Sequence, residues 1–131
     1  MIDINKYIEI PFKPQGRDFS GCDCYGLIYL FYKTEYNKEL PLLTNSYDNP
    51  HEHKRIQDLI TLEMPILNVV EIENPYEGCV VLFKFVGYTC HMGIYIGKNK
   101  ILHVMNKSNS VCEKIDSIRL RGRLDGFYEF K

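Results

Sequence analysis

The sequence lacks tryptophan altogether, and it lacks any apolar run long enough to cross a lipid bilayer. Residues 1–6 have neither the charged start nor the apolar core and small-residue cleavage site of a secretory signal. We therefore expect a chain that is made and folded in a cytoplasm and that has no membrane span.

The sequence also lacks a large excess of either charge. It has 16 Lys and Arg residues and 17 Asp and Glu residues, for a formal net charge of −1. Such a balance gives no general attraction to nucleic acid or to an anionic membrane. The only local candidate is the alternating set Arg119, Arg121 and Arg123, which would share one side of a strand. Three arginines more often form a solvated edge or ion pairs, so we expect no nucleic-acid partner.

The cysteines do not form an even set, which argues against a disulfide framework. There are five, and in a cytoplasm they are expected to be thiols: Cys22, Cys24, Cys79, Cys90 and Cys112. A zinc site built from Cys22, Cys24, Cys90 and His91 is conceivable. Adjacent residues of a strand point to opposite faces, however, and the two-residue spacers of structural zinc sites are absent. We expect neither metal nor cofactor.

What the sequence does contain is enough apolar material for one core, because 45% of its 131 residues are hydrophobic. We expect a single domain over residues 1–131. The pattern places helices first and an antiparallel meander afterwards, which is an α+β arrangement.

The first half is organised around residues 21–32, where a glycine-bounded polar turn runs into the most apolar stretch of the chain. Asp23 is a good N-terminal cap, and apolar side chains on nearly every face predict a buried helix with Cys24 in its first turn. Two prolines and a glycine make residues 11–18 a loop. The helical pattern ends at residues 37–41, and a second helix is predicted over residues 51–61.

The second half has the shorter period of strands. Residues 79–86 lie between two glycines and have the β-branched and aromatic content of a buried strand. Residues 91–96 and 100–105 read as a hairpin around the turn 97–99, whose Gly and Asn tolerate positive φ. Two later strands are predicted around residues 110–112 and 126–130.

Cys24 is the candidate nucleophile, because the N-terminus of a helix favours an anion and lowers a thiol's pKa toward neutrality. Its base would be a histidine, His91 or His103. A three-residue turn at 97–99 would pair Gly93 with His103 and place both rings on one face, about 7 to 8 Å apart along the diagonal. A two-residue turn would put the rings on opposite faces.

These segments resemble the NlpC family of papain-like cell-wall cysteine endopeptidases. Residues 21–27, Gly-Cys-Asp-Cys-Tyr-Gly-Leu, are similar to that family's nucleophile motif, and residues 91–97, His-Met-Gly-Ile-Tyr-Ile-Gly, are similar to its base motif. After the nucleophile and the base, the family has a third polar residue on the next strand, and His103 stands at that position here. The resemblance extends over essentially the whole chain and implies a papain-like fold with the nucleophile at the start of a central helix.

The resemblance also implies roles for individual residues. Cys24 would attack an amide carbonyl, His91 would accept and return the proton, and His103 would orient His91. Phe12, Asp23 and Tyr25 would bind substrate, a peptidoglycan stem peptide cleaved between D-glutamate and the diamino acid. Residues 10–12, 17–18, 23–27 and 39–41 are most similar to the tailed-phage tail-protein subgroup, which implies a location in the virion tail, other tail proteins as partners, and local wall opening during DNA delivery.

Two departures from the family leave alternatives open. Phe12 stands where the family commonly has a tyrosine, and Tyr25 stands where ordinary members have serine. The loss of one oxyanion donor can cost about a hundredfold in rate, so a catalytically idle structural part of an assembly is the second hypothesis. The third is a permuted acyltransferase in which Cys112, following a histidine strand, is the nucleophile.

Overall fold

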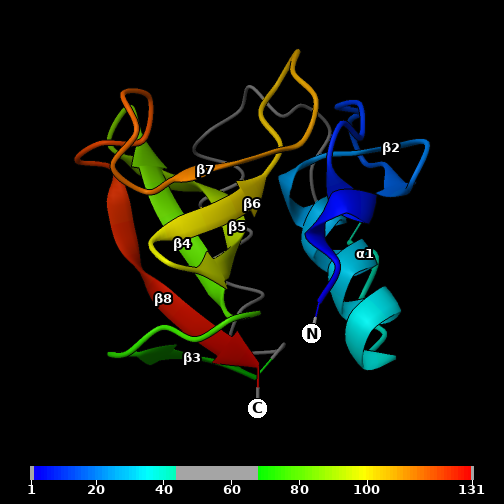
Figure 1. The fold of residues 1–131 in the computed structure, drawn as a ribbon, viewed down its shortest axis with the longest axis horizontal. Helices are drawn as coiled ribbons and strands as arrows, with labels where there is room; N and C mark the ends of the chain where they lie inside the picture. The colour runs from blue at the N-terminus through cyan, green and yellow to red at the C-terminus, as the bar shows by residue number, and fades with distance from the viewer. Residues whose placement is uncertain (1, 44–67, 131) are drawn as a thin grey trace.

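The computed structural model describes residues 2–43 and 68–130, and within these ranges one long helix lies beside a six-stranded antiparallel sheet (Figure 1). The sheet has the strand order β3-β8-β4-β5-β6-β7, and a separate two-stranded hairpin precedes the helix. In chain order the elements are the 3-10 helix η1 (Ile4–Tyr7), β1 (Arg17–Asp18), β2 (Gly21–Cys22), α1 (Cys24–Tyr36), β3 (Val69–Ile72), β4 (Val80–Phe85), β5 (Tyr88–Gly97), β6 (Lys100–His103), β7 (Val111–Lys114) and β8 (Leu124–Phe130). The predicted α+β class is confirmed.

Helix α1 begins where the sequence predicts. The Asp23 side chain accepts a hydrogen bond of 2.8 Å from the Gly26 N–H and caps the helix. At the other end Asn37 adopts the left-handed conformation that terminates helices. All eight residues from Tyr25 to Tyr32 are buried, because the helix is covered by the sheet on one side and by the N-terminal segment on the other.

The sheet separates two apolar clusters. The larger lies between the sheet and α1 and includes Leu82, Met92, Ile94 and Leu102. The smaller lies on the other face and is formed by Val81, Phe83, Ile101, Ile115 and Leu120. This division follows from the alternation of side chains along β4, β5 and β6.

The hairpin of β5 and β6 differs from the prediction in its turn. The turn has two residues, Lys98 and Asn99, which both have positive φ. Gly97 pairs with Lys100, but Tyr95 already pairs with Ile101, so the ladder contains a β-bulge at the intervening residue of β5. The extra residue restores the register that the three-residue turn was expected to give.

Two further features were not predicted, the small hairpin of β1 and β2 and the strand β3. Strand β1 lies at the end of the segment 11–18 that was expected to be a loop, and β2 lies in the turn expected before the helix. The helix predicted over residues 51–61 lies outside the described residues. No helix among the described residues is both long and apolar enough to cross a membrane.

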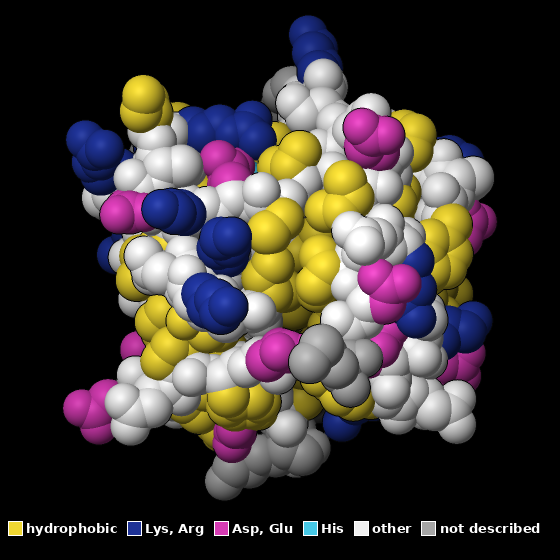
Figure 2. All heavy atoms as spheres, viewed as in Figure 1, with side chains coloured by type: hydrophobic (Ala, Val, Ile, Leu, Met, Phe, Trp, Pro, Cys, Tyr) yellow, Lys and Arg dark blue, Asp and Glu magenta, His cyan; other side chains and the backbone are white. Residues whose placement is uncertain are grey.

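The three arginines do not share a strand, because the segment between β7 and β8 consists of turns. Figure 2 shows lysine and arginine side chains gathered over β7 and the loop that follows it. Arg119 makes an ion pair with Glu113, and Arg121 and Arg123 donate hydrogen bonds to the backbone carbonyls of Asp116 and Arg119. The arginines therefore stabilise this loop.

Candidate active site

Cys24 is the first residue of α1, and its side chain is partly exposed. The backbone of Met92 in β5 hydrogen-bonds to the sulfur. The β5–β6 ladder runs only as far as the pair Ile94 and Leu102, so Met92 and the preceding His91 lie beyond its end. The start of the helix thus contacts β5 at Met92, the residue that follows His91.

Burial raises the pKa of the Cys24 thiol to about 12, and the Asp23 carboxylate adds to this effect. Hydrogen bonds from the backbones of Met92 and Tyr25 act in the opposite direction but are outweighed. The expectation of a lowered pKa at the helix start is therefore wrong for this structure, because desolvation exceeds the effect of the helix dipole. At neutral pH the group is therefore a protonated thiol.

His91 and His103 lie on the same face of the sheet, as predicted. His91 Nε2 is 2.8 Å from His103 Nδ1, and both side chains are buried. The His91 ring also packs against Phe83 and Phe85, with ring centroids 5.8 and 5.6 Å away. These contacts fix the ring and leave Nδ1 as its remaining nitrogen, which has no hydrogen bond to any described residue.

Both imidazoles have lowered pKa values. Burial lowers the pKa of His91 well below its ordinary value, and the neighbouring His103 and Arg119 add to this. Burial also lowers the pKa of His103, although the hydrogen bond to Glu113 and its charge oppose the shift. Both rings are therefore neutral at pH 7, which is the state that a general base requires.

Glu113 is a polar residue of the site that the sequence did not indicate. Its Oε1 atom forms a short hydrogen bond with His103 Nε2 and accepts two further contacts of 3.0 and 2.9 Å from Arg119. Its Oε2 atom accepts a hydrogen bond of 2.9 Å from Ser117. The signal was available, because His103 pairs with Val111, and Glu113 two positions later lies on the same face of β7.

Comparison with known proteins agrees with this geometry. Residues 9–124 match the NlpC/P60 family. The chain belongs to the NlpC/P60 family. None of the curated proteins compared with it matches.

Three solved structures share the fold. The NlpC/p60 domain of the peptidoglycan hydrolase SagA is 18% identical, with a TM-score of 0.62 over 95% of this chain and 89% of that chain. A protein similar to lipoprotein, of the NLP/P60 family, from Staphylococcus aureus subsp. aureus Mu50 is 20% identical, with a TM-score of 0.65 over 95% and 38%. An NlpC/P60 family protein from Bacillus cereus ATCC 10987 is 16% identical, with a TM-score of 0.67 over 95% and 36%. The chain thus spans little more than a third of the latter two, and the comparison confirms a papain-like NlpC/P60 fold.

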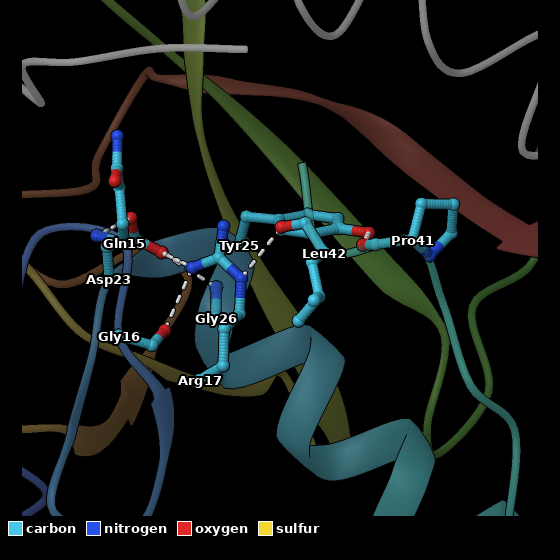
Figure 3. A network of polar contacts seen from close by, with 8 residues as sticks. All are labelled: Gln15, Gly16, Arg17, Asp23, Tyr25, Gly26, Pro41 and Leu42. Carbon is cyan, nitrogen blue, oxygen red and sulfur yellow. Dashed lines mark hydrogen bonds and ion pairs between the residues drawn. The ribbon is translucent and has the colours of Figure 1, made fainter. Parts of the chain in front are cut away.

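The side chains of Asp23 and Tyr25 make internal contacts in this NlpC/P60 domain (Figure 3). Asp23 Oδ1 lies 3.0 Å from Arg17 Nη1, and its Oδ2 accepts a hydrogen bond of 2.8 Å from the Gln15 N–H. The Tyr25 hydroxyl donates a hydrogen bond of 2.6 Å to the Pro41 carbonyl. These contacts hold the loop before Cys24 in place, and a direct role of either residue in substrate binding stays a prediction.

Backbone pairing brings Phe12 near the start of α1. It forms a parallel bridge with Cys22, two residues before Cys24, and its ring is partly buried against the larger apolar cluster. The NlpC/P60 position that commonly carries a tyrosine hydroxyl is thus held beside the start of α1, but it carries no hydroxyl. Its role toward substrate also stays a prediction.

Two alternatives find no support in the geometry. Cys112 is exposed, and on β7 it alternates with Val111 and Glu113, so it faces away from His103. Within residues 2–43 and 68–130, no group of three or more His, Cys, Asp or Glu side chains could hold a metal ion. The arrangement of this NlpC/P60 domain is instead a thiol next to a strand that carries one of two hydrogen-bonded neutral imidazoles, the second of which is hydrogen-bonded to the Glu113 carboxylate.

Proposed function

We propose that this NlpC/P60 domain is a cysteine peptidase that hydrolyses an amide bond of a peptidoglycan stem peptide. One observation carries the proposal: the partly exposed Cys24 thiol meets β5 next to His91, whose ring is held by His103. A nucleophile, a base and a group that orients the base are the components of covalent acyl transfer. The similarity to a peptidoglycan hydrolase domain supports the choice of substrate class.

The reaction begins with a neutral pair, because the pKa of the thiol is raised and that of the imidazole is lowered. The thiol proton moves to His91 Nδ1 as the sulfur attacks the amide carbonyl carbon. The tetrahedral intermediate then collapses to a thioester, and the His91 imidazolium gives its proton to the leaving amine. Water, deprotonated by His91, attacks the thioester and releases the carboxylic acid and the free thiol.

The oxyanion of the tetrahedral intermediate needs hydrogen-bond donors that are not already used. Asp23 accepts hydrogen bonds from the N–H groups of Gly26 through its side chain and of Leu27 through its carbonyl. The N–H group of Cys24 is therefore a first-turn donor left for the oxyanion. The cap fixes the start of the helix and so fixes the direction of this donor.

The finer assignment rests on sequence resemblance. We place the cleaved bond between D-glutamate and the diamino acid, and the setting in a tailed-phage virion, where local wall opening would accompany DNA delivery. Other tail proteins would be its partners. Detection of the chain in purified virions by mass spectrometry would support this setting, and its presence only in lysate fractions free of tails would contradict it.

Turnover of a purified stem tetrapeptide, followed by liquid chromatography and mass spectrometry, tests the activity. We expect wild-type protein to release two fragments, Cys24→Ala to release none, and Cys112→Ala to match the wild type because Cys112 faces away from the site. Wild-type protein that releases no fragments, or Cys24→Ala that releases them equally fast, would overturn the proposal.

A second candidate is a catalytically idle structural domain, which the raised pKa of Cys24 and the phenylalanine at position 12 favour. Alkylation by a thiol probe at neutral pH discriminates between the two. An idle domain should alkylate at Cys24 no faster than at the exposed Cys112, whereas a base-assisted thiol should react faster than Cys112 in spite of its partial burial.

A further inference from the structure

We infer that Glu113 is a positioning residue that sets the tautomers of His103 and His91, so that Nδ1 of His91 is left unprotonated as the base. The inference rests on the proposed cysteine peptidase activity for its consequence in catalysis. Its structural content, the position of two ring protons, is independent of that activity. It follows from the direction of two hydrogen bonds, one between Glu113 and His103 and one between His103 and His91.

The carboxylate of Glu113 is the fixed end of this chain. Burial alone would raise its pKa, but hydrogen bonds from Arg119, His103 and Ser117 together lower it below its ordinary value. Glu113 is therefore ionised at neutral pH, and an ionised carboxylate can only accept hydrogen bonds. The hydrogen bond between Oε1 and His103 Nε2 consequently has its proton on the imidazole nitrogen.

The state of His103 follows from that of Glu113. The pKa of His103 is lowered, so the ring is neutral and carries a single N–H at pH 7. Since Nε2 carries that proton, Nδ1 has a lone pair and can only accept. His103 Nδ1 lies 2.8 Å from His91 Nε2, and the proton of this hydrogen bond must therefore belong to His91.

The state of His91 follows in the same way. Its pKa is lowered, so it is neutral, and its single N–H is at Nε2. Nδ1 is then the unprotonated nitrogen, and it makes no hydrogen bond with any described residue. The tautomer that Glu113 sets through His103 is thus the one in which His91 can accept the thiol proton.

Arg119 supports this arrangement from the loop after β7. It holds Glu113 Oε1 through two contacts of 3.0 and 2.9 Å, which keep the carboxylate ionised and aimed at His103. Its positive charge also helps to lower the pKa of both histidines. Arg119 therefore favours neutral rings, and Glu113 decides which nitrogen of each neutral ring bears the proton.

The test reads the tautomers directly, by long-range proton–nitrogen correlation NMR of protein labelled with 15N-histidine at pH 7. We expect both His91 and His103 of the wild type to be protonated at Nε2, with signals assigned through single His→Gln variants. Glu113→Ala removes the acceptor and should produce a mixture that includes the Nδ1–H form of both rings. Glu113→Gln keeps an acceptor oxygen for His103 and Arg119 and should retain the wild-type tautomers.

Glu39→Ala is the matched control, because Glu39 is an exposed carboxylate whose nearest ion partner, Lys33, is 3.8 Å away. It should change neither spectrum nor rate. A wrong tautomer at a directly oriented histidine costs about 10⁴ in kcat. Because Glu113 acts through one further ring, we expect Glu113→Ala to lower kcat by about 10- to 100-fold with KM nearly unchanged, and Glu113→Gln to restore most of it.

The inference is overturned if wild-type His91 is protonated at Nδ1. It is also overturned if Glu113→Ala, folded as judged by its thermal unfolding, keeps both tautomers and the wild-type kcat. If the wild type cleaves no stem peptide but shows the expected tautomers, the proposed function fails while the assignment of Glu113 stands. If Glu113→Ala does not fold, the wild-type and Glu113→Gln spectra still decide the question.

Discussion

His91 Nε2 lies 2.8 Å from His103 Nδ1, although the two-residue turn between their strands would by itself place the rings on opposite faces of the sheet. The bulge between Tyr95 and Gly97 adds one residue to β5 and brings the rings back to one face. The pairing of the two imidazoles, the proposed base and its proposed orienting group, thus depends on a local irregularity of the hairpin.

Gly93 is the position where this close pairing is most sensitive to volume. A Cβ at Gly93 would lie 3.0 Å from the Leu102 carbonyl oxygen and 3.1 Å from His103 Cβ. We expect Gly93→Ala to displace His103, to lower the free energy of unfolding by about 1 to 3 kcal/mol and to slow turnover. Urea unfolding and stem-peptide turnover measure both effects.

Gly126→Ala is the control for this prediction. The nearest atom to its added Cβ is Glu71 Oε2 at 2.9 Å, the end of a flexible side chain. It should therefore cost less stability and leave turnover unchanged. Equal losses of turnover in the two variants would show that the spacing at Gly93 has no special importance.

Arg17 compensates the buried negative charge of Asp23, the residue before Cys24. Its Nη1 lies 3.0 Å from Asp23 Oδ1, and the two side chains are 9% and 3% exposed. Removing one partner of a buried pair leaves the other charge uncompensated, so Arg17→Ala should destabilise the protein by about 3 kcal/mol. Lys33→Ala, which breaks an exposed pair with Glu39, should cost less than about 1 kcal/mol. Similar midpoints of thermal unfolding for the two variants would contradict a structural role of the Arg17 pair.

Phe12 offers a gain-of-function test. If the family's hydroxyl at this position assists the oxyanion, Phe12→Tyr should raise kcat by about tenfold or more, because one oxyanion donor is typically worth at least about a hundredfold. Phe19→Tyr adds a hydroxyl to an exposed ring and should have no effect on rate. Unchanged turnover of Phe12→Tyr, with its fold intact, would remove position 12 from the site.

The lowered pKa of His91 makes stability depend on pH in a defined direction. The unfolded chain binds a proton at His91 near pH 6.5, but the folded chain binds it only at lower pH. Stability is therefore complete above about pH 6.5 and decreases as the pH falls toward the folded-state pKa, by at most about 1.4 kcal/mol per pH unit for this group.

Urea unfolding at pH 7.5 and pH 5.5 measures this dependence. We expect the wild type to lose more stability between these two values than His91→Gln, which has no imidazole at this position. His103 and the remaining histidines are present in both proteins, so their difference reports mainly on His91. An equal loss in the two proteins would show that His91 titrates normally in the folded state.

The sequence predicted those features that depend on neighbouring residues. The capped start of α1 at Cys24, the buried helix and the strands carrying the two histidines all follow from local apolar patterns and capping chemistry. The facing of the histidines was right although the turn length was wrong, because the bulge at Ile96 compensated for the shorter turn.

The features that were missed depend on contacts between distant segments. The pKa of Cys24 is decided by burial against β5, which the helix N-terminus alone does not reveal. Glu113 joins the site only through the pairing of β6 with β7 and through Arg119 in the following loop. Charge compensation of Asp23 by Arg17 likewise requires the hairpin of β1 and β2.

Selective labelling of the thiol tests most directly whether His91 activates Cys24. The probe is a stem peptide that ends in a chloromethyl ketone, and the labelled cysteine is located by peptide mass spectrometry at pH 7. We expect the label on Cys24 alone in the wild type, with the exposed Cys112 unmodified, and its rate to fall at least about tenfold in His91→Ala, in which general-base assistance is lost. Label spread over Cys24 and Cys112 alike, or an unchanged rate in His91→Ala, would contradict the assignment of Cys24 and His91 as nucleophile and base.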